Sequence, residues 1–350
     1  MLCTLSKLKF LSLLIVVVVV VISAHLNAKT VSSLRLENKK IGIYYYSDQV
    51  IANDTATGNQ QYFSNLPSEL KNQLSELNPD LLVNVYNLNN KLPFEIDNYL
   101  RLNKDFAITI GKNVMLQILA SRTDIPVFSL NTPRVTLDRM RKIYSDLGFQ
   151  LSGIYREQPL SHQLALAEAI KPENKNIYLL LGMLSRYHIE QYKTEVARQD
   201  FSIHFKILQN QDSPVAYFNS LSPQDGFLTL LDNPQQFTRQ KIELLLPCSF
   251  QSNIPMIGNR KLHGEIGALA SVYSSESELI SESIKVINQY FASGKYKEPD
   301  YLEKFSVFIN QQIAQNFNYK NLDENQLELL VDAKINQLNK KPVKEVRQIN

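Results

Sequence analysis

The chain alternates between short apolar runs and longer segments in which apolar residues recur every three or four positions. Short apolar runs bounded by turn residues are typical of buried strands, whereas the longer spacing is typical of helices with one buried face. By this pattern we expect strands at residues 40–46, 81–86, 105–110, 125–130, 153–155, 176–181, 201–208, 227–231, 254–258 and 304–309. Helices are expected at residues 66–77, 94–103, 114–121, 160–170, 187–200, 237–246, 277–291 and 311–317.

The order of these elements predicts the fold class. Strands and helices alternate with short connections, which is typical of a parallel sheet covered by helices on both faces. The alternation occurs in each half of the chain, and the strands IPVFSL (125–130) and IPMIG (254–258) occupy matching places in the two halves. We therefore predict an α/β protein with two similar, doubly wound parallel-sheet lobes.

Composition narrows the class of protein. Of the 350 residues, 44% are hydrophobic and 20% are charged, which excludes a largely disordered chain. The formal net charge is +3, and without Lys7 and Lys9 the remainder holds 35 basic against 34 acidic residues. This balance provides no electrostatic footprint for nucleic acid. The two cysteines, Cys3 and Cys248, exclude a disulfide scaffold and a zinc site built from cysteines.

Residues 1–28 have the pattern of a secretory signal peptide. Lys7 and Lys9 precede an apolar run at 10–22, and small residues follow. A run of this length is shorter than the roughly 20 residues that span a bilayer as a helix. The sequence therefore predicts an exported, periplasmic chain. An uncleaved membrane anchor is the alternative, because a cut after Ala24 or after Ala28 would have no small residue three places before it.

Three segments carry a resemblance to a known family. They are GIYREQPLSHQ at 153–163, IPMIGNRKLHGEIGALASV at 254–272 and YLEKFSVFINQQIA at 301–314. These segments resemble the substrate-binding proteins of ABC transporters, of the type that binds tryptophan and other aromatic amino acids. The resemblance implies a type I periplasmic-binding-protein fold, in which two lobes joined by three crossings hold a ligand in the cleft between them.

The resemblance also implies a division of the chain. The first lobe would comprise residues 29–152 and 274–303, the second 153–273 and 304–317, and a polar tail 318–350. The tail contains one amphipathic stretch, so it is expected to be partly helical. Either it packs on a lobe as a helix or it is a loose appendage.

Ligands of open α/β sheets bind beyond the carboxyl ends of the strands, where helix N-termini present unpaired amide groups. In the first lobe this rule selects Ser47, Asp48, Gly111, Lys112, Asn113, Asn131 and Thr132. In the second lobe it selects Ser185, Arg186, Asp232, Asn259 and Arg260. Tyr155 and Gln158 match residues typical of the resembling family, which implies that they face the hinge side of the cleft.

Each candidate has a functional and a structural interpretation. Arg186 and Arg260 could each pair with a ligand carboxylate, but arginines are more often surface residues. Asp48 and Asp232 could bind a ligand amine, although aspartate at a strand end usually caps a turn or a helix. Gln158 precedes Pro159, and this pair commonly starts a helix.

Two loops depart from the family pattern. Many relatives have Asp-Pro and a glycine-rich continuation where this chain has Asn-Thr-Pro-Arg at 131–134. The strand that often ends in Gly-Phe-Ser in the family ends here in Gly-Asn-Arg at 258–260. The chemistry of the binding site should therefore differ from that of the tryptophan-binding members. We expect a small polar ligand, carboxylated or amino-acid-like.

The sequence shows no catalytic motif. It lacks the G-x-S-x-G, G-x-x-x-x-G-K and H-E-x-x-H patterns, and its five histidines are widely spaced. We therefore expect no catalytic residues, no cofactor and no metal site. An enzyme on this scaffold is the weakest of three alternatives.

The leading prediction is the solute-binding component of an ABC-type transport system, a monomer whose partners are a small ligand and an inner-membrane permease. The alternative is a periplasmic sensor or interaction protein on the same fold. It would signal to a membrane partner or would have lost the ability to bind a small ligand. Neighbouring genes would discriminate between them, since a permease and an ATPase indicate transport, whereas a kinase or receptor indicates sensing.

Overall fold

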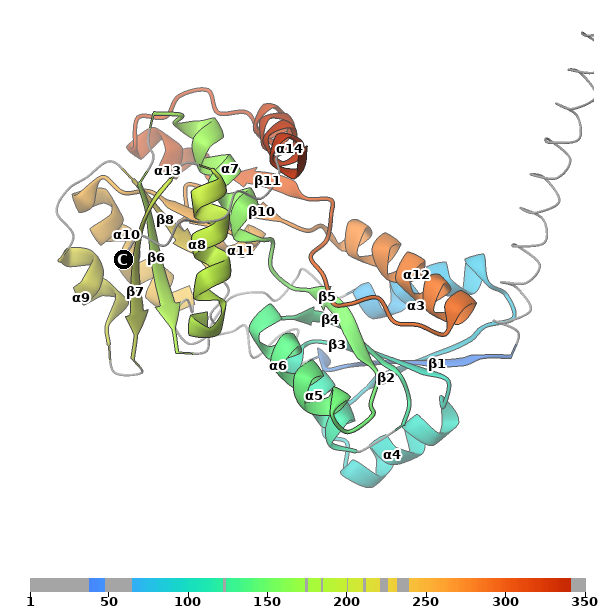
Figure 1. The fold of residues 1–350 in the computed structure, drawn as a ribbon. Coiled ribbons are helices and arrows are strands. Elements are labelled where there is room, and N and C mark those ends of the chain that lie inside the picture. The colour runs from blue at the N-terminus through green and yellow to red at the C-terminus, as the bar shows by residue number, and fades with distance from the viewer. Residues whose placement is uncertain are drawn as a thin grey trace, which may run out of the picture.

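The computed structural model describes residues 38–340 apart from 48–64, 122–123, 174–175, 184, 200, 210–211, 221–225 and 232–238. The expected leader lies outside the described residues. The described part of the chain forms two α/β lobes, each built on its own sheet (Figure 1). The predicted fold class is therefore confirmed.

The first lobe is a five-stranded sheet in the order β2-β1-β3-β4-β5. Its strands are all parallel, and they are β1 (Lys40–Tyr45), β2 (Leu82–Asn87), β3 (Phe106–Ile110), β4 (Val127–Thr132) and β5 (Leu151–Tyr155). The helices between the strands are α3 (Leu66–Leu77), α4 (Pro93–Leu102), α5 (Lys112–Ala120) and α6 (Arg134–Ser145). A later helix, α12 (Glu276–Ser293), returns to this lobe and packs on α3.

Alternation along β1 explains why helices cover both faces of this sheet. Ile41 and Ile43 belong to a core that α3 and α12 complete, whereas Tyr44 belongs to a core formed with α4 and α5. All three side chains have no exposed surface. A strand that is buried on both faces has a nearly continuous apolar sequence, which is usual for the strands of a parallel sheet.

The second lobe is a six-stranded sheet in the order β11-β10-β9-β8-β6-β7. Its strands are β6 (Asn176–Gly182), β7 (Ser202–Leu208), β8 (Phe227–Leu230), β9 (Met256–Gly258), β10 (Ala270–Tyr273) and β11 (Ser306–Ile309). Only β11 is antiparallel to its neighbour, β10. The helical elements are α7 (Leu160–Ile170), η1 (Ser185–His188), α8 (Ile189–Arg198), α9 (Pro214–Asn219), α10 (Arg239–Ser252), α11 (Lys261–Glu265), α13 (Gln311–Asn316) and α14 (Glu324–Lys340).

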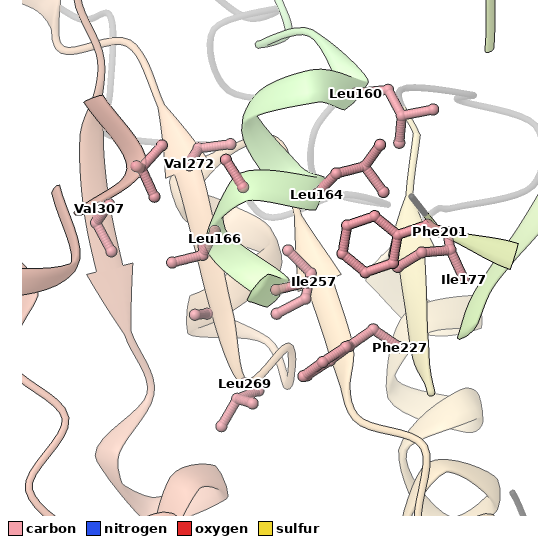
Figure 2. Close-up of a cluster of buried hydrophobic side chains, with 14 of the residues drawn as sticks. Leu160, Leu164, Leu166, Ile177, Phe201, Phe227, Ile257, Leu269, Val272 and Val307 are labelled. Carbon is pink, nitrogen blue, oxygen red and sulfur yellow. The ribbon is translucent and has the colours of Figure 1, made fainter. Parts of the chain in front are cut away.

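The main core of the second lobe lies between α7 and the sheet (Figure 2). Leu164 and Leu166 of α7 pack with Ile257 of β9 and Phe227, all fully buried. Complete burial of such a side chain contributes about 1.5–3 kcal/mol, so this layer stabilises the lobe substantially.

Three connections join the two sheets. The first runs through 156–159 between β5 and α7, the second through 274–275 between β10 and α12, and the third through 294–305 between α12 and β11. The resemblance placed Gly153 and Tyr155 in the second lobe, but the strand that contains both pairs with β4 in the first sheet. The third connection touches β5 as well, through a bridge between Ile154 and Asp300.

Several elements differ from the pattern-based expectation. The pattern predicted none of α6, α9, α11 and β10, and α10 runs to Ser252 through Pro247 rather than ending at residue 246. The polar tail contains α14, which packs against α7 and β11. Leu327 and Val331 of α14 enter the main core of the second lobe, and Lys334 lies 2.8 Å from Glu168 of α7.

Candidate functional site

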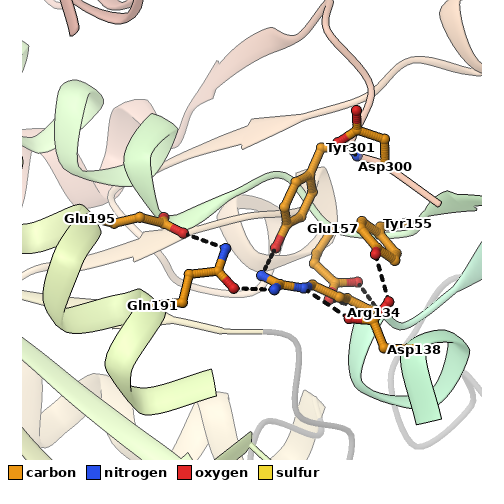
Figure 3. Close-up of polar contacts among 8 residues, drawn as sticks. All are labelled: Arg134, Asp138, Tyr155, Glu157, Gln191, Glu195, Asp300 and Tyr301. Carbon is orange, nitrogen blue, oxygen red and sulfur yellow. Dashed lines mark hydrogen bonds and ion pairs between the residues drawn. The ribbon is translucent and has the colours of Figure 1, made fainter. Parts of the chain in front are cut away.

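Helix α6 of the first lobe and helix α8 of the second come together through one arginine, Arg134 (Figure 3). The residues around it come from both lobes and from two of the connections. We call this group the interlobe cluster, and its members are Arg134, Asp138, Tyr155, Glu157, Gln191, Glu195 and Tyr301.

The backbone positions Arg134 at the start of α6. Pro133 is the N-cap residue and supplies no side-chain hydrogen bond. The backbone N–H of Arg134 instead donates to the carboxylate of Glu157, at 3.0 and 3.3 Å to its two oxygens. A carboxylate satisfies the unpaired N–H groups of a helix N-terminus and interacts favourably with the helix dipole. Glu157 therefore ties the first connection to α6.

The side chain of Arg134 has three hydrogen-bond acceptors. Its Nε donates to Asp138 Oδ2 at 3.2 Å, one terminal nitrogen donates to the Tyr301 hydroxyl at 2.8 Å, and the other donates to Gln191 Oε1. Only 12% of the side chain is exposed. Because Gln191 belongs to α8, this last hydrogen bond joins the two lobes directly.

Two tyrosine rings flank the guanidinium. Its central carbon lies 5.8 Å from the centroid of Tyr155 and 5.5 Å from that of Tyr301. The two rings meet edge to face with centroids 4.9 Å apart. The Tyr155 hydroxyl donates to Asp138 Oδ1 at 2.6 Å, so Asp138 holds both the arginine and one of the rings beside it. Contact with aromatic faces stabilises a cation electrostatically.

Burial changes the protonation behaviour of the cluster. It raises the pKa of Tyr155, reinforced by the hydrogen bond to Asp138, and it raises the pKa of Tyr301. Burial lowers the pKa of the Arg134 guanidinium, but the interactions with Tyr301 and Asp138 raise it by more. The pKa is therefore above its ordinary value. Burial raises the pKa of Glu195 as well, although the hydrogen bond from the backbone N–H of Ser161 acts to lower it. The arginine is thus a permanent cation in a site of low dielectric, where a charge-assisted hydrogen bond is strong.

The cluster has unused hydrogen-bonding capacity. A guanidinium has five N–H donors, and among the described residues only three of those of Arg134 have an acceptor. One N–H remains on each terminal nitrogen, and free N–H groups of a guanidinium are suited to carboxylate oxygens. Three residues earlier in the same loop, Asn131 Oδ1 is buried without a hydrogen-bond partner in the described part of the chain. N–H donors of a cation are suited to a carboxylate, and a buried amide oxygen is suited to an amine.

The structure places the predicted residues of the first lobe at strand ends. The Ser47 hydroxyl accepts hydrogen bonds from the side chains of Asn87 and Asn89, at 2.9 and 2.7 Å. Gly111 has a φ of 97° and starts α5, with Lys112 and Asn113 in its first turn. Asn131, with a φ of 54°, and the buried Thr132 end β4 immediately before the cluster. Thr132 shares a 2.7 Å hydrogen bond with Ser129.

The predicted residues of the second lobe divide into two groups. Ser185 is buried and Arg186 exposed, both in η1. Asn259 and Arg260 are buried beyond β9, where Arg260 donates to His263 at 3.0 Å. Asp48 and Asp232 lie outside the described residues.

Two predicted residues lie at the junction of the lobes. Tyr155 belongs to the interlobe cluster, whereas Gln158 is buried among the connections and donates its backbone N–H to the carbonyl of Asn259. The pattern did not select Arg134, Asp138, Gln191 or Tyr301 as binding residues. The only sequence signal was the departure of the 131–134 loop from the family pattern, which ends at Arg134.

The described residues also form a surface cavity that shares no residue with the interlobe cluster. It has a volume of about 600 Å³, lies between α12 and α14, and is lined by four acidic side chains and one basic one: Glu278, Glu303, Glu328, Asp332 and Lys304. In the described part of the chain no group of three or more histidine, cysteine or acidic residues is placed to hold a metal ion. Nor does any helix within it have the length and apolar character needed to cross a membrane.

Neither a protein-family model nor a curated protein matches the chain. Solved structures do. An ABC domain from Streptococcus pneumoniae in complex with L-Trp is 16% identical, with a TM-score of 0.53 over 83% of this chain and 98% of that one. A substrate-binding protein with adhesive properties from Clostridium difficile, in its ligand-free, open form, is 15% identical, with a TM-score of 0.59 over 82% and 97% of the two chains.

A conserved domain protein from Vibrio cholerae is 14% identical, with a TM-score of 0.52 over 83% of this chain and 98% of that one. The matches extend over nearly the whole of each of these proteins and include both lobes. Together with the two mostly parallel sheets and their three connections, they show that the chain has the type I periplasmic-binding-protein fold.

Proposed function

We propose that the protein is the solute-binding component of an ABC-type transport system and that it closes its two lobes on a small carboxylated, amino-acid-like molecule beside Arg134. The ligand would lie between α6 and α8, where the interlobe cluster joins the lobes. It would stabilise the closed arrangement only as far as it binds that arrangement better than the open one.

The observation that carries the proposal is the state of the Arg134 side chain. It is 12% exposed, positively charged and flanked by Tyr155 and Tyr301, and it retains one N–H on each terminal nitrogen among the described residues. A planar guanidinium suits a carboxylate better than a point charge would.

The surroundings support an amino acid over a simple organic acid. Asn131 Oδ1, a buried acceptor, could receive a hydrogen bond from a ligand ammonium group. The rings of Tyr155 and Tyr301 offer an apolar surface for the rest of the ligand. Leaving a buried acceptor without a partner costs about 1–3 kcal/mol, which a ligand amine would recover.

Export and partner follow from the same proposal. The leader at residues 1–28 would direct the chain to the periplasm, and the closed form would dock on an inner-membrane permease. Two proteins of the same fold support a binding role, since one was solved with L-Trp and another is a substrate-binding protein. The chain would act as a monomer, with no cofactor and no bound nucleic acid.

A thermal-shift screen tests the proposal. The chain from Lys29, refolded to remove bound ligand, is screened against amino acids and small organic acids. A ligand at about one hundred times its Kd should add about 2.7 kcal/mol to the free energy of unfolding and raise the Tm. Arg134→Lys keeps the charge but loses the planar fork, so it should weaken the Kd about ten- to hundredfold and remove most of the shift.

The matched control is Arg141→Lys, on the same helix. Arg141 pairs with Glu298 at the surface and has no part in the cluster, so the ligand-induced shift should persist in this variant. A flat response of the wild type across the whole library would contradict solute binding. An equal shift in the wild type and Arg134→Lys would contradict the assignment of the site.

One observation favours a second function, that of a periplasmic sensor or interaction protein. The Arg134–Gln191 hydrogen bond joins the lobes through the protein's own side chains, so the interlobe contact does not depend on a ligand. A flat screen combined with a neighbouring gene for a kinase or receptor, in place of a permease and an ATPase, would favour this function.

A further inference from the structure

The amide of Gln158 lies where all three connections between the lobes meet. Gln158 belongs to the first connection and is 1% exposed. Its Nε2 donates to Ser274 Oγ of the second connection at 2.7 Å and to the Lys304 carbonyl of the third connection at 3.2 Å. The Leu302 carbonyl, also on the third connection, lies 3.5 Å from Nε2, so the two N–H groups of the amide serve acceptors on both of the other connections.

The oxygen of the same amide also has a hydrogen-bond partner. Gln158 Oε1 lies 2.8 Å from Nδ1 of His162, in the first turn of α7. Because Nε2 faces the carbonyl oxygens of Leu302 and Lys304, the atom beside His162 is the amide oxygen, and the proton of the neutral imidazole is on Nδ1. The ring of His162 in turn packs against Phe305 of the third connection, with centroids 4.8 Å apart. His162 therefore fixes the orientation of the amide.

The bonded segments are those that pass between the lobes. On the third connection, Leu302 lies in the core of the first lobe and Phe305 in the core of the second, so Lys304 lies at the transition. Ser274 likewise separates β10 of the second sheet from α12 of the first lobe. The backbone N–H of Gln158 also donates to the carbonyl of Asn259, at 3.4 Å. A rotation of one lobe against the other must change these bonds.

We propose that Gln158 is a positioning residue of the hinge, which holds the three connections together and sets the equilibrium between open and closed arrangements of the lobes. This inference rests on the proposed function in so far as the lobes close on a ligand. In a hinge, a few residues absorb the backbone change, and their bonds set the relative free energies of the end states. Gln158 would then influence ligand affinity without touching the ligand, through the fraction of binding-competent molecules.

The test measures the distance between the lobes without any ligand. Nitroxide labels are placed on the exposed positions Lys142 of α6 and Glu190 of α8, in a Cys248→Ser background of the chain from Lys29, which lacks Cys3. The distance distribution is recorded by pulsed electron paramagnetic resonance. Gln158→Met keeps the length of the side chain and removes both donors. It should change the open-to-closed ratio by about tenfold, which a single buried hydrogen bond can account for, seen as a shifted or broadened distribution.

Gln199→Met is the matched control. Gln199 is 2% exposed and its Nε2 also donates to a backbone carbonyl, that of Ser161 at 3.0 Å, but both residues belong to the second lobe. This variant should lose a comparable hydrogen bond and leave the distance distribution of the wild type unchanged. Gln158→Asn, whose amide is one methylene too short to reach both connections, serves as the second variant should Gln158→Met fail to fold.

A folded Gln158 variant with the wild-type distribution would overturn the inference, as would an equal change in Gln199→Met. Because the readout needs no ligand, it is independent of the thermal-shift screen. A flat screen with an altered distribution would contradict solute binding and leave the hinge role standing. A positive screen with an unaltered distribution would support solute binding and contradict the hinge role.

Discussion

His162 is a buried histidine whose charge state is set by its surroundings. Its side chain is 7% exposed, one ring nitrogen is committed to Gln158, and the ring packs against Phe305. Burial lowers the pKa of His162 from its ordinary 6.5 to about 4. The folded protein therefore holds this imidazole neutral at pH values where the unfolded chain would already bind a proton.

This difference makes stability depend on pH. Above pH 6.5 the imidazole is neutral in both the folded and the unfolded state, so its burial does not make the free energy of unfolding depend on pH. As the pH falls from 6.5 to 4, only the unfolded chain binds the proton, and the free energy of unfolding decreases by about 3 kcal/mol over this range. Below pH 4 the folded state is protonated too and the loss is complete.

His162→Asn should remove this dependence, because the asparagine amide can donate to Gln158 in place of Nδ1 and does not titrate. The variant should be less stable at pH 7.5, since the contact with Phe305 is lost. Its free energy of unfolding should fall less steeply than that of the wild type between pH 6.5 and 4. Urea unfolding at several pH values measures both slopes, and parallel profiles would contradict the assignment.

The residues of the candidate site could be predicted only in part. The strand-end rule selected Asn131 and Thr132 because their position follows from the strand that precedes them. Arg134 is two residues beyond, but its partners Gln191 and Tyr301 are 57 and 167 residues away in sequence. Such partners are brought together only by packing of the lobes, which no local pattern encodes.

At the scale of elements, hydrophobic periodicity predicted those helices that bury a continuous apolar stripe. Helices α3 and α7 begin and end at the expected residues, and each buries several leucines. Helix α6 was not predicted because Leu137 is its one buried residue. Its start is instead stabilised by Glu157, from beyond the next strand. A helix that depends on a tertiary cap and on charged partners has a weak apolar signal.

Helix α14, like α7, packs its buried side chains into the main core of the second lobe. Leu327 is 4% exposed and lies in the main core, whereas Leu329, on the same helix, is 73% exposed. Leu327→Ala should lower the free energy of unfolding by about 3 kcal/mol, as deletion of a buried leucine side chain does. Leu329→Ala, which removes the same atoms from the surface, should change it by less than about 0.5 kcal/mol.

Urea unfolding followed by circular dichroism measures both variants. Equal losses of stability in the two would show that α14 does not pack on the second lobe as described. The comparison is informative because side-chain size, helix propensity and position in the chain are matched, and only burial differs.

At the scale of the whole molecule, two sheets are joined by three connections that Gln158 ties together, with Arg134 spanning the lobes beside them. The order of strands and helices was sufficient to predict two α/β lobes, because short right-handed connections leave few alternatives, whereas the three connections were implied by the family resemblance. The strand β10 was not predicted, since its four residues are too few to show a period. The spatial relation of the lobes could not be predicted at all, because long-range side-chain contacts determine it.

The central claim is that the lobes close on a carboxylated ligand held by Arg134. Small-angle X-ray scattering, with and without a saturating ligand from the thermal screen, tests it most directly. We predict that the radius of gyration falls on ligand addition in the wild type and in Arg141→Lys, and that it stays unchanged in Arg134→Lys at the same ligand concentration. An unchanged radius in the wild type despite binding, or an equal fall in Arg134→Lys, would contradict the account.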